Sequence, residues 1–303
     1  RIHAITAAMP GPTGLLPFQA RFPDRTHDVG IAEQHAAVLA AGMAMGGLKP
    51  VVAVYSTFFS RCFDQAAYDV GLHHLPVVFA LDRAGITGDD GPSHHGVLDL
   101  GLCLKVPGMT IFAPSSVQEL GVMLPAALAL DAPAVLRFPK GVAREVPPDQ
   151  VGRGLEARCA RHADDPLQAV CFLAVGKLVE AAEEAAAKLE AEGVPATVWD
   201  VRVVRPLDPA MVADACRHRL VITCEDGMAV GGAGQFMELA ISDHAGPAAP
   251  RTIVVGTPDE YLSHAKAASI LARLGLDAEG LAARALTELR RMPPAPAGPP
   301  LGS

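Results

Sequence analysis

Residues 50–81 read PVVAVYSTFFSRCFDQAAYDVGLHHLPVVFAL, and they predict a strand, a helix and a second strand in succession. The strands are the short apolar runs Pro50–Tyr55 and Pro76–Leu81. Phe58–Val70, between them, has apolar residues at helical spacing. A helix that joins two buried strands is typical of a parallel sheet. This stretch therefore predicts an α/β fold.

The same alternation continues through the first half of the chain. Strands are predicted at Arg1–Thr6, Thr110–Ala113 and Ala134–Phe138, and helices at Ile31–Met45 and Ser116–Leu128. Because strands that alternate with helices form a parallel sheet, we predict one parallel-sheet α/β domain at residues 1–145.

A polar segment rich in Arg and Asp, with Pro147-Pro148 in its middle, separates this domain from a second alternation. We predict a linker at 146–165, a smaller α/β domain at 166–292, and a disordered tail of Pro, Ala and Gly at 293–303. In the second domain, strands are predicted at Ala169–Val175, Ala196–Asp200, Leu220–Cys224 and Thr252–Val255, and helices at Leu178–Glu192 and after Gly231-Gly232.

The composition restricts the class of protein. A formal net charge of -8 and the absence of a Lys/Arg-rich run argue against a nucleic-acid-binding surface. The six cysteines form no C-x-x-C pair, which argues against a zinc site or a disulfide framework and favours a reducing cytoplasm. No apolar run is long enough to span a bilayer, so we expect a soluble protein. Since the chain starts at Arg1 and enters a strand at once, we expect it to begin inside a larger gene product or after a cut.

Two short segments combine polar and aromatic groups at the ends of predicted elements. In DVGIAEQH (28–35), Glu33 begins a helix that is otherwise apolar, so it is either a partner of the helix dipole or a buried functional carboxyl. In YSTFFSR (55–61), a strand ends and a helix begins, with two adjacent aromatics and Arg61. Ligands bind beyond the carboxyl ends of strands in open α/β sheets. Core packing with a solvated Arg61 is the alternative.

The most informative segment is DRAGITGDDGPSHHG (82–96), which follows a predicted strand. It contains four Gly, three Asp, two His and one Arg, and such a loop is costly to order without a purpose. A plain surface loop is one alternative, and a metal site built from Asp89, Asp90, His94 and His95 is another, although helix-borne ligand spacing is missing. A later glycine cluster at 227–234 either holds a phosphate or forms a tight strand-to-helix turn.

Four motifs together resemble, in order and spacing, the 1-deoxy-D-xylulose-5-phosphate synthase family of the transketolase superfamily. They are D-V-G-I-A-E-Q-H-A, P-V-V-A-V-Y-S-T-F-x-x-R, D-R-A-G-x-x-G-x-D-G-P-x-H-x-G and F-P-K-G. Arg205–Asp208, Cys224–Gly234 and Gly256–Asp277 resemble the carboxy-terminal domain of the same family. The family's amino-terminal diphosphate-binding domain, with its G-D-G…N magnesium motif, has no counterpart here. The resemblance therefore covers a thiamine-pyrimidine-binding domain and a transketolase C-terminal-like domain only.

This resemblance implies a transferase of the transketolase class that depends on thiamine diphosphate. The implied reaction is decarboxylative condensation of pyruvate with glyceraldehyde 3-phosphate to 1-deoxy-D-xylulose 5-phosphate and CO2. That product serves isoprenoid biosynthesis through the methylerythritol phosphate pathway and the biosynthesis of thiamine and pyridoxal precursors. The implied partner is a diphosphate-binding domain or separate subunit, which would bind most of the Mg²⁺, in a homodimer or heterotetramer.

The resemblance also assigns expected roles to single residues. Glu33, His94 and Asp90 are expected to be catalytic; Glu33, Phe58 and Ile31 to contact the cofactor; and Tyr55, Arg61, Arg83 and Lys140 to contact substrate, with no metal ligand in this chain. Glu33 would hydrogen-bond the aminopyrimidine ring, Phe58 would stack on it, and Arg83 would hold the acceptor's phosphate.

One position departs from the family and bears on the substrate. Where the family usually has R-Y-P-R-G, this chain has Arg137-Phe138-Pro139-Lys140-Gly141, and a lysine lacks the bidentate fork with which arginine binds phosphate. The acceptor is therefore expected to bind more weakly or to be a different aldehyde. A split transketolase subunit, a 2-oxo acid dehydrogenase beta-type subunit and a non-catalytic paralogue are the alternative interpretations.

Overall fold

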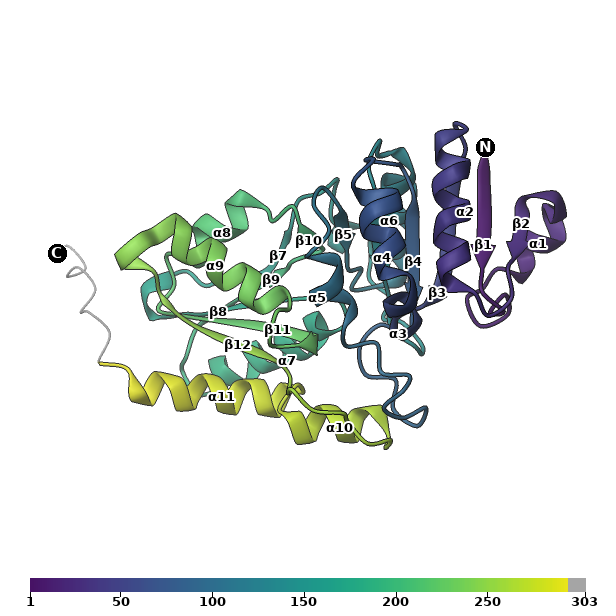
Figure 1. Ribbon diagram of the computed structural model, residues 1–303. Coiled ribbons are helices and arrows are strands. Elements are labelled where there is room, and N and C mark those ends of the chain that lie inside the picture. The colour runs from purple at the N-terminus through teal and green to yellow at the C-terminus, as the bar shows by residue number, and fades with distance from the viewer. Residues whose placement is uncertain (294–303) are drawn as a thin grey trace.

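The computed structural model describes residues 1–293. It contains two β-sheets that lie one after the other along the long axis of the molecule (Figure 1). Residues 294–303, which make up all but the first residue of the predicted tail, lie outside the described residues. The α/β fold class with mostly parallel sheets, predicted from the alternation of strands and helices, is confirmed.

The first sheet has seven strands in the order β10-β5-β6-β4-β3-β1-β2. All neighbours are parallel except β10 and β5. The strands are β1 (Ile2–Thr6), β2 (Thr26–Asp28), β3 (Lys49–Tyr55), β4 (Val78–Asp82), β5 (Thr110–Phe112), β6 (Ala134–Arg137) and β10 (Val203–Arg205).

Helices cover both faces of the first sheet, because each face carries a row of buried aliphatic side chains. Alanines of α2 (Glu33–Met45) pack with Ile5, Val52 and Leu81 on one face. Met123 and Ala127 of α6 (Val117–Ala129) pack on the other. Between β3 and β4 the chain forms α3 (Ser56–Phe59), a 3-10 turn at Ser60–Cys62, α4 (Phe63–Gln65) and a π-helical turn at Ala66–Gly71. Two other short helices of this half are α1 (Leu16–Arg21) and α5 (Asp99–Cys103).

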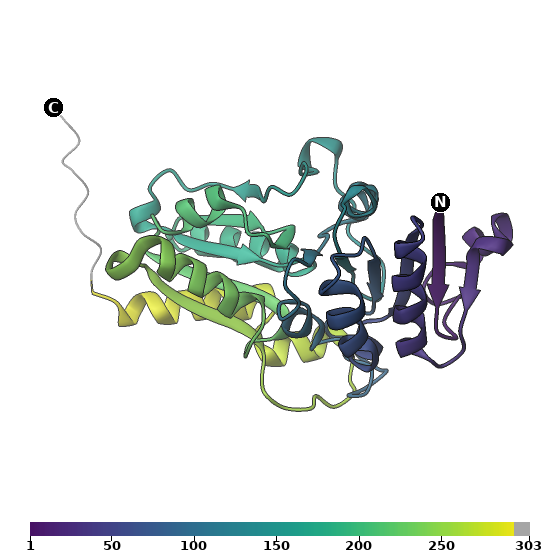
Figure 2. The same cartoon turned by 45° about the horizontal axis from the view of Figure 1, so that its top comes forward.

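The second sheet has five strands in the order β12-β11-β8-β9-β7. Its core contains Phe172, Ala182 and Leu281 on the face covered by α7 and α11, and the opposite face packs under α8 and α9 (Figure 2). The elements are β7 (Arg158–Arg161), β8 (Val170–Ala174), α7 (Leu178–Ala191), β9 (Ala196–Asp200), α8 (Pro209–Ala215), β11 (Leu220–Met228), α9 (Ala233–Ala245), β12 (Arg251–Thr257), α10 (Ala267–Leu274) and α11 (Ala278–Arg291).

Two short strands differ from the sequence-based expectation. β7 lies inside the predicted linker and pairs antiparallel with β9 as an edge strand. β10 lies inside the predicted second domain, yet it pairs with β5 of the first sheet, Val203 opposite Phe112. Both strands are stabilised by contacts distant in sequence, and neither has the apolar alternation that reveals a longer strand.

The two halves are fixed to each other by a shared core and a buried ion pair. One continuous apolar cluster includes Leu81 and Val135 of the first sheet and Leu173 and Val221 of the second. Arg202 Nε lies 2.8 Å from Glu119 Oε2, with both side chains 1% exposed. The two sheets are therefore in direct contact through a shared core.

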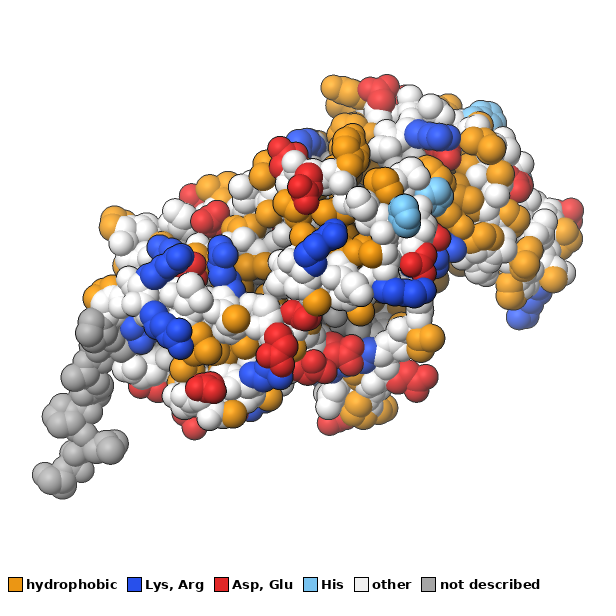
Figure 3. Space-filling model, turned by 90° about the horizontal axis from the view of Figure 1, so that it is seen from below, with side chains coloured by type: hydrophobic (Ala, Val, Ile, Leu, Met, Phe, Trp, Pro, Cys, Tyr) orange, Lys and Arg blue, Asp and Glu red, His pale blue; other side chains and the backbone are white. Residues whose placement is uncertain are grey.

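The surface is mixed in character. On the face seen in Figure 3, acidic and basic side chains are interspersed with apolar ones, without a continuous basic area. In the part of the chain that the structure describes, no helix combines the length and the apolar character needed to cross a membrane.

Candidate functional site

The candidate site lies at the edge of the first sheet where the parallel strands end. Tyr55 is the last residue of β3 and lies opposite Asp82, the last residue of β4. β3 is followed directly by α3, and β4 is followed by residues 83–96, which we call the 83–96 loop. Parallel strands bring their carboxyl ends to one edge, so the three candidate segments of the sequence converge here.

Glu33 is a buried acid at the start of α2. Its residue is only 2% exposed, and its Oε2 lies 3.5 Å from Arg61 Nη1. The amino-terminal end of a helix stabilises a negative charge. Burial, and after it the Glu33 carboxylate, raises the pKa of the neighbouring Cys62 thiol to about 12. The site therefore holds a carboxyl in a poorly solvated place with a partly exposed cation at its edge.

An aromatic cluster lies next to this acid. The rings of Tyr55 and Phe58 are stacked with centroids 5.6 Å apart, and the ring of His94 meets Phe58 edge-on at 5.5 Å. Arg61 lies over the Phe58 ring at 5.2 Å and Arg83 over the Tyr55 ring at 4.0 Å, both measured from Cζ to the centroid. Phe58 and Tyr55 are only half-buried, so part of each ring remains accessible.

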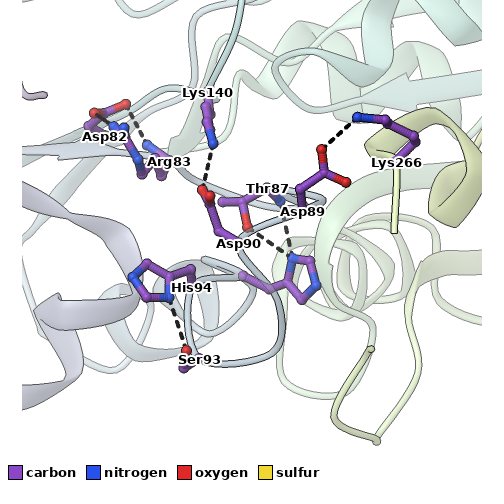
Figure 4. A network of polar contacts seen from close by, with 10 residues as sticks. Asp82, Arg83, Thr87, Asp89, Asp90, Ser93, His94, Lys140 and Lys266 are labelled. Carbon is purple, nitrogen blue, oxygen red and sulfur yellow. Dashed lines mark hydrogen bonds and ion pairs between the residues drawn. The ribbon is translucent and has the colours of Figure 1, made fainter. Parts of the chain in front are cut away.

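The 83–96 loop presents charged groups of both signs at the same edge (Figure 4). Arg83, at φ +60°, forms an ion pair with Asp82. Lys140 Nζ lies 2.6 Å from Asp90 Oδ2, and this hydrogen bond holds the pKa of Asp90 below its ordinary value. His94 Nδ1 lies 2.9 Å from Ser93 Oγ. The pairing of Asp90 with Lys140 links the loop to the segment after β6.

The neighbouring Asp89 and His95 point away from this group. Asp89 pairs with Lys266 at 2.8 Å. His95 is buried, and its Nδ1 accepts a hydrogen bond from the backbone N–H of Thr87 at 3.1 Å, so it stiffens the loop from within. Burial lowers the pKa of His95. Among residues 1–293, no three His, Cys, Asp or Glu side chains are grouped so that they could hold a metal ion.

Ile31 is the predicted cofactor contact that the structure leaves at the surface. It is 78% exposed, two residues before the buried Glu33. The remaining eight predicted site residues lie at or next to the strand edge, connected through the contacts of Arg61, Tyr55, Phe58 and the 83–96 loop.

In the glycine cluster at 227–234, backbone N–H groups are already bonded to a side chain of the protein. The Glu225 carboxylate accepts hydrogen bonds from the backbone N–H groups of Ala233 and Gly234 at 3.1 and 2.6 Å, at the start of α9. Burial raises the pKa of Glu225 to about 7. Since a side chain of the protein occupies the N–H groups that a phosphate would use, the cluster is a tight turn with its own cap.

Sequence reasoning missed a buried ion-pair cluster beneath the 83–96 loop. Arg137 donates from Nε to Asp99 Oδ2 at 2.8 Å and from Nη2 to Asp226 Oδ1 at 3.0 Å, and Lys177 Nζ lies 3.0 Å from Asp226 Oδ2. Arg137 and Asp226 belong to quoted motifs, but residues 89 positions apart give no local signal of contact.

A cleft of about 900 Å³ opens between the two halves beside this cluster. Its walls include Arg83, Lys140 and Lys177 together with apolar residues such as Phe138 and Leu271. Two cations of the predicted substrate side, Arg83 and Lys140, therefore border this cleft.

The site geometry fits the aminopyrimidine ring of thiamine diphosphate. That ring needs a carboxyl partner in a poorly solvated place and a flat apolar surface. Glu33 is such a carboxyl, and the half-buried Phe58 is such a surface.

Comparison with known proteins agrees with this fit. The family model described as transketolase, pyrimidine binding domain matches residues 1–145, and that described as transketolase, C-terminal domain matches residues 162–281. The 1-deoxy-D-xylulose-5-phosphate synthase of Thermobifida fusca is 48% identical over 294 residues, which are 95% of this chain and 45% of that protein. The protein of the same name from Mycobacteroides abscessus is 49% identical over 283 residues, which are 93% of this chain and 44% of that protein. The chain thus spans less than half the length of these relatives.

Solved structures give the same result for the fold. One described as "Split gene transketolase, inactive beta4 tetramer" has a TM-score of 0.82 and 26% identity, and the match covers 95% of this chain and 92% of that one. Transketolase from Campylobacter jejuni has a TM-score of 0.78 at 17% identity, covering 94% of this chain and 43% of that one, and shows the fold alone. The chain belongs to the transketolase family, of which it contains the pyrimidine-binding and C-terminal domains.

Proposed function

We propose that this chain supplies half of the active site of a thiamine-diphosphate-dependent transferase that makes 1-deoxy-D-xylulose 5-phosphate and CO2 from pyruvate and glyceraldehyde 3-phosphate. The observation that carries the proposal is the convergence of Glu33, Phe58 and the 83–96 loop at one strand edge. Relatives of 45–49% identity that bear the name of this synthase support it. The product would feed isoprenoid, thiamine and pyridoxal precursor synthesis in the cytoplasm.

The proposed cofactor contacts are Glu33, Phe58 and Ile31. When bound, thiamine diphosphate supplies the electron sink for decarboxylation and carbon–carbon bond formation. Glu33 would hydrogen-bond the aminopyrimidine ring and exchange a proton with it, because it is a carboxyl buried at the edge where that ring would lie. Phe58 would offer its ring face to the pyrimidine. Ile31, exposed here, would be covered when the diphosphate-binding half lies against this edge.

That missing half is the proposed partner, as a domain or a separate subunit in a homodimer or heterotetramer. The diphosphate and most of the Mg²⁺ coordination would belong to it, because residues 1–293 contain no candidate metal cluster. The matched segment covers 45% and 44% of the two synthases, and the proposed partner would correspond to a part of those proteins outside it.

The proposed substrate contacts are cations and polar groups around the aromatic cluster. Arg83 would bind the phosphate of the acceptor with its guanidinium fork. Lys140 would add a point charge that its partner Asp90 partly neutralises. Tyr55 and Arg61 would border the donor, and His94, beside Phe58, would exchange a proton with the reacting oxygens.

The test reconstitutes this chain with a diphosphate-binding half and follows CO2 release from pyruvate, with and without glyceraldehyde 3-phosphate. We expect release to need both halves and the cofactor, to increase with the acceptor, and to be lost in Glu33→Ala. A reconstituted pair that binds the cofactor and leaves pyruvate unchanged would contradict the proposed donor.

A split transketolase is the second candidate, and a specific observation favours it. The solved split-gene transketolase chain matches this one over 92% of its own length at a TM-score of 0.82. Supplying the same pair with ketose phosphate donors instead of pyruvate separates the two reactions. A 2-oxo acid dehydrogenase beta-type subunit would transfer neither a ketose-derived nor a pyruvate-derived unit to an aldehyde acceptor.

A further inference from the structure

The C-terminal domain reaches the candidate site through an ion-pair cluster. Asp99 and Arg137 come from the pyrimidine-binding domain, and Lys177 and Asp226 come from the C-terminal domain. The side chains of Asp99, Arg137 and Asp226 are 1–3% exposed and that of Lys177 is 23% exposed. Two cations balance two carboxylates. Although burial opposes its ionisation, Lys177 and Arg137 hold the pKa of Asp226 below its ordinary value, so this carboxylate is charged.

This cluster contacts the base of the 83–96 loop directly. Lys177 Nζ lies 3.3 Å from the backbone oxygen of Ile86. Gly85 has φ +74°, and a Cβ there would lie 1.7 Å from Asp226 Oδ2. The carboxylate of Asp226 therefore fills the space under Gly85, and only glycine fits this position.

The rest of the loop rests on the same domain. Gly88 and Gly91 also have positive φ, and a Cβ on Gly88 would lie 2.9 Å from the backbone nitrogen of Ala267. A Cβ on Gly91 would lie 3.4 Å from the Cβ of His264. The backbone N–H groups of Gly85 and Gly96 each bond to the other's oxygen at 2.8 Å and close the loop at its base. The path of the loop thus depends on what lies beneath its base.

Asp226 also contacts the segment that leads from β6 to Lys140. Its Oδ1 accepts from Arg137, the last residue of β6, and Lys140 follows three residues later. Asp226 is therefore bonded to Arg137 on the β6 side and lies against Gly85 on the β4 side. Its two neighbours belong to the segments that present Lys140 and Arg83 to the cleft. Since a buried ion pair is a poor general source of stability, we consider the position of this cluster rather than its energy.

We propose that Asp226 and Lys177 are positioning residues, through which the C-terminal domain sets the 83–96 loop so that Arg83 and Lys140 face the acceptor's phosphate. This rests on the proposed function for the identity of the acceptor. It gives the C-terminal domain an indirect part in acceptor binding, through the position of the 83–96 loop.

The first test reads the loop itself and needs no turnover. Hydrogen–deuterium exchange is measured on the reconstituted pair for Asp226→Asn, which keeps the volume under Gly85 and removes the charge, and for Lys177→Met. We expect backbone N–H groups of residues 83–96 to exchange roughly tenfold faster in both variants. The matched control is Glu225→Gln, because Glu225 is an adjacent buried carboxyl that bonds α9 and not the loop.

The second test is kinetic. We expect the KM for glyceraldehyde 3-phosphate to rise about tenfold in Asp226→Asn and in Lys177→Met, with the KM for pyruvate and the cofactor affinity changing less than about twofold. Lys177→Arg should recover most of the loss, since it restores a cation beside Asp226. A variant that merely destabilised the fold would raise both KM values or lower the amount of active enzyme.

The outcomes separate the two proposals. If the parent pair does not turn over pyruvate, the proposed function fails, and loop exchange alone decides the positioning role. If exchange in residues 83–96 is unchanged in both variants, or Glu225→Gln changes it as much as Asp226→Asn, the positioning role is wrong. Should Asp226→Asn not fold, Lys177→Met, whose side chain is partly exposed, gives the same decision.

Discussion

Lys140 Nζ lies 2.6 Å from Oδ2 of Asp90, and this bond joins the segment after β6 to the 83–96 loop. The pair makes Lys140 a point charge that is already partly neutralised. A guanidinium at this position could bond Asp90 and still offer a second N–H edge to a phosphate.

We therefore predict that Lys140→Arg lowers the KM for glyceraldehyde 3-phosphate roughly threefold to tenfold, and that Lys140→Ala raises it by a similar factor. Steady-state kinetics with the acceptor varied at saturating pyruvate measure both. The control is Lys266→Ala, since Lys266 pairs with Asp89 on the far side of the same loop. Equal acceptor KM values in Lys140→Ala and the parent would remove Lys140 from the binding site.

The depressed pKa of Asp90 predicts how this link depends on pH. Lys140 stabilises the ionised carboxylate, so the link is complete above the ordinary carboxyl pKa and is lost as pH falls through the lower pKa of the folded protein. NMR titration of the Asp90 carboxyl checks this. In Lys140→Ala the pKa should return toward its ordinary value, and a titration curve that does not move would show that the ion pair is absent in solution.

Glu33→Gln tests whether this buried acid exchanges a proton or only accepts hydrogen bonds. Glutamine keeps the volume and an acceptor oxygen but cannot ionise, so we predict a fall in kcat of about 10²- to 10⁴-fold, with protein stability close to the parent. CO2 release and thermal unfolding measure the two effects. As a control, Asp69→Asn changes an acid on the exposed side of the helical segment after α4. Retention of more than a tenth of the parental kcat in Glu33→Gln would exclude proton exchange as its role.

The sequence predicted those parts of the molecule that local patterns determine. Apolar runs and helical spacing located β3, β4, β8, β9, α2 and α7 to within about two residues, because each element has its own periodic face. The helical stretch 58–70 was located correctly, but it consists of short α, 3-10 and π segments.

Features determined by distant contacts were missed. Arg202 meets Glu119 across 83 positions and Arg137 meets Asp226 across 89, and nothing in either neighbourhood indicates the partner. The resemblance of the motifs to a known family assigned Glu33, Phe58 and Arg83 to one proposed site, and the structure places all three near the same edge of the sheet. The ion-pair cluster beneath them joins side chains of both halves, so the pattern of neither half alone could predict it.

Glu225 makes a prediction about stability and pH. Its pKa in the folded protein is about 7, above the ordinary 4.5, so between these values the folded state binds more protons than the unfolded state. The free energy of unfolding should therefore fall as pH rises from about 4.5 to about 7, by on the order of 3 kcal/mol from this group. Denaturant unfolding at a series of pH values checks the slope. Glu225→Gln should flatten it, and Asp200, whose pKa burial also raises to about 7, should account for a further part. A slope that is the same in Glu225→Gln as in the parent would contradict this assignment.

The pair Glu119–Arg202 makes a prediction about how the two halves hold together. Glu119 bonds Arg202 Nε at 2.8 Å, and the guanidinium also donates to the backbone oxygens of Arg153 and Glu156, so the pair fixes residues 152–156 against both sheets. Glu119→Ala would leave a buried cation without its carboxylate, which costs about 3–5 kcal/mol. Denaturant unfolding should show this loss. Replacing both residues, as in Glu119→Leu with Arg202→Met, removes the unpaired charge and should restore part of the stability, because the cost lies mainly in the unpaired charge. If the double variant is less stable than Glu119→Ala, the backbone hydrogen bonds of Arg202 contribute more to the junction than its ion pair.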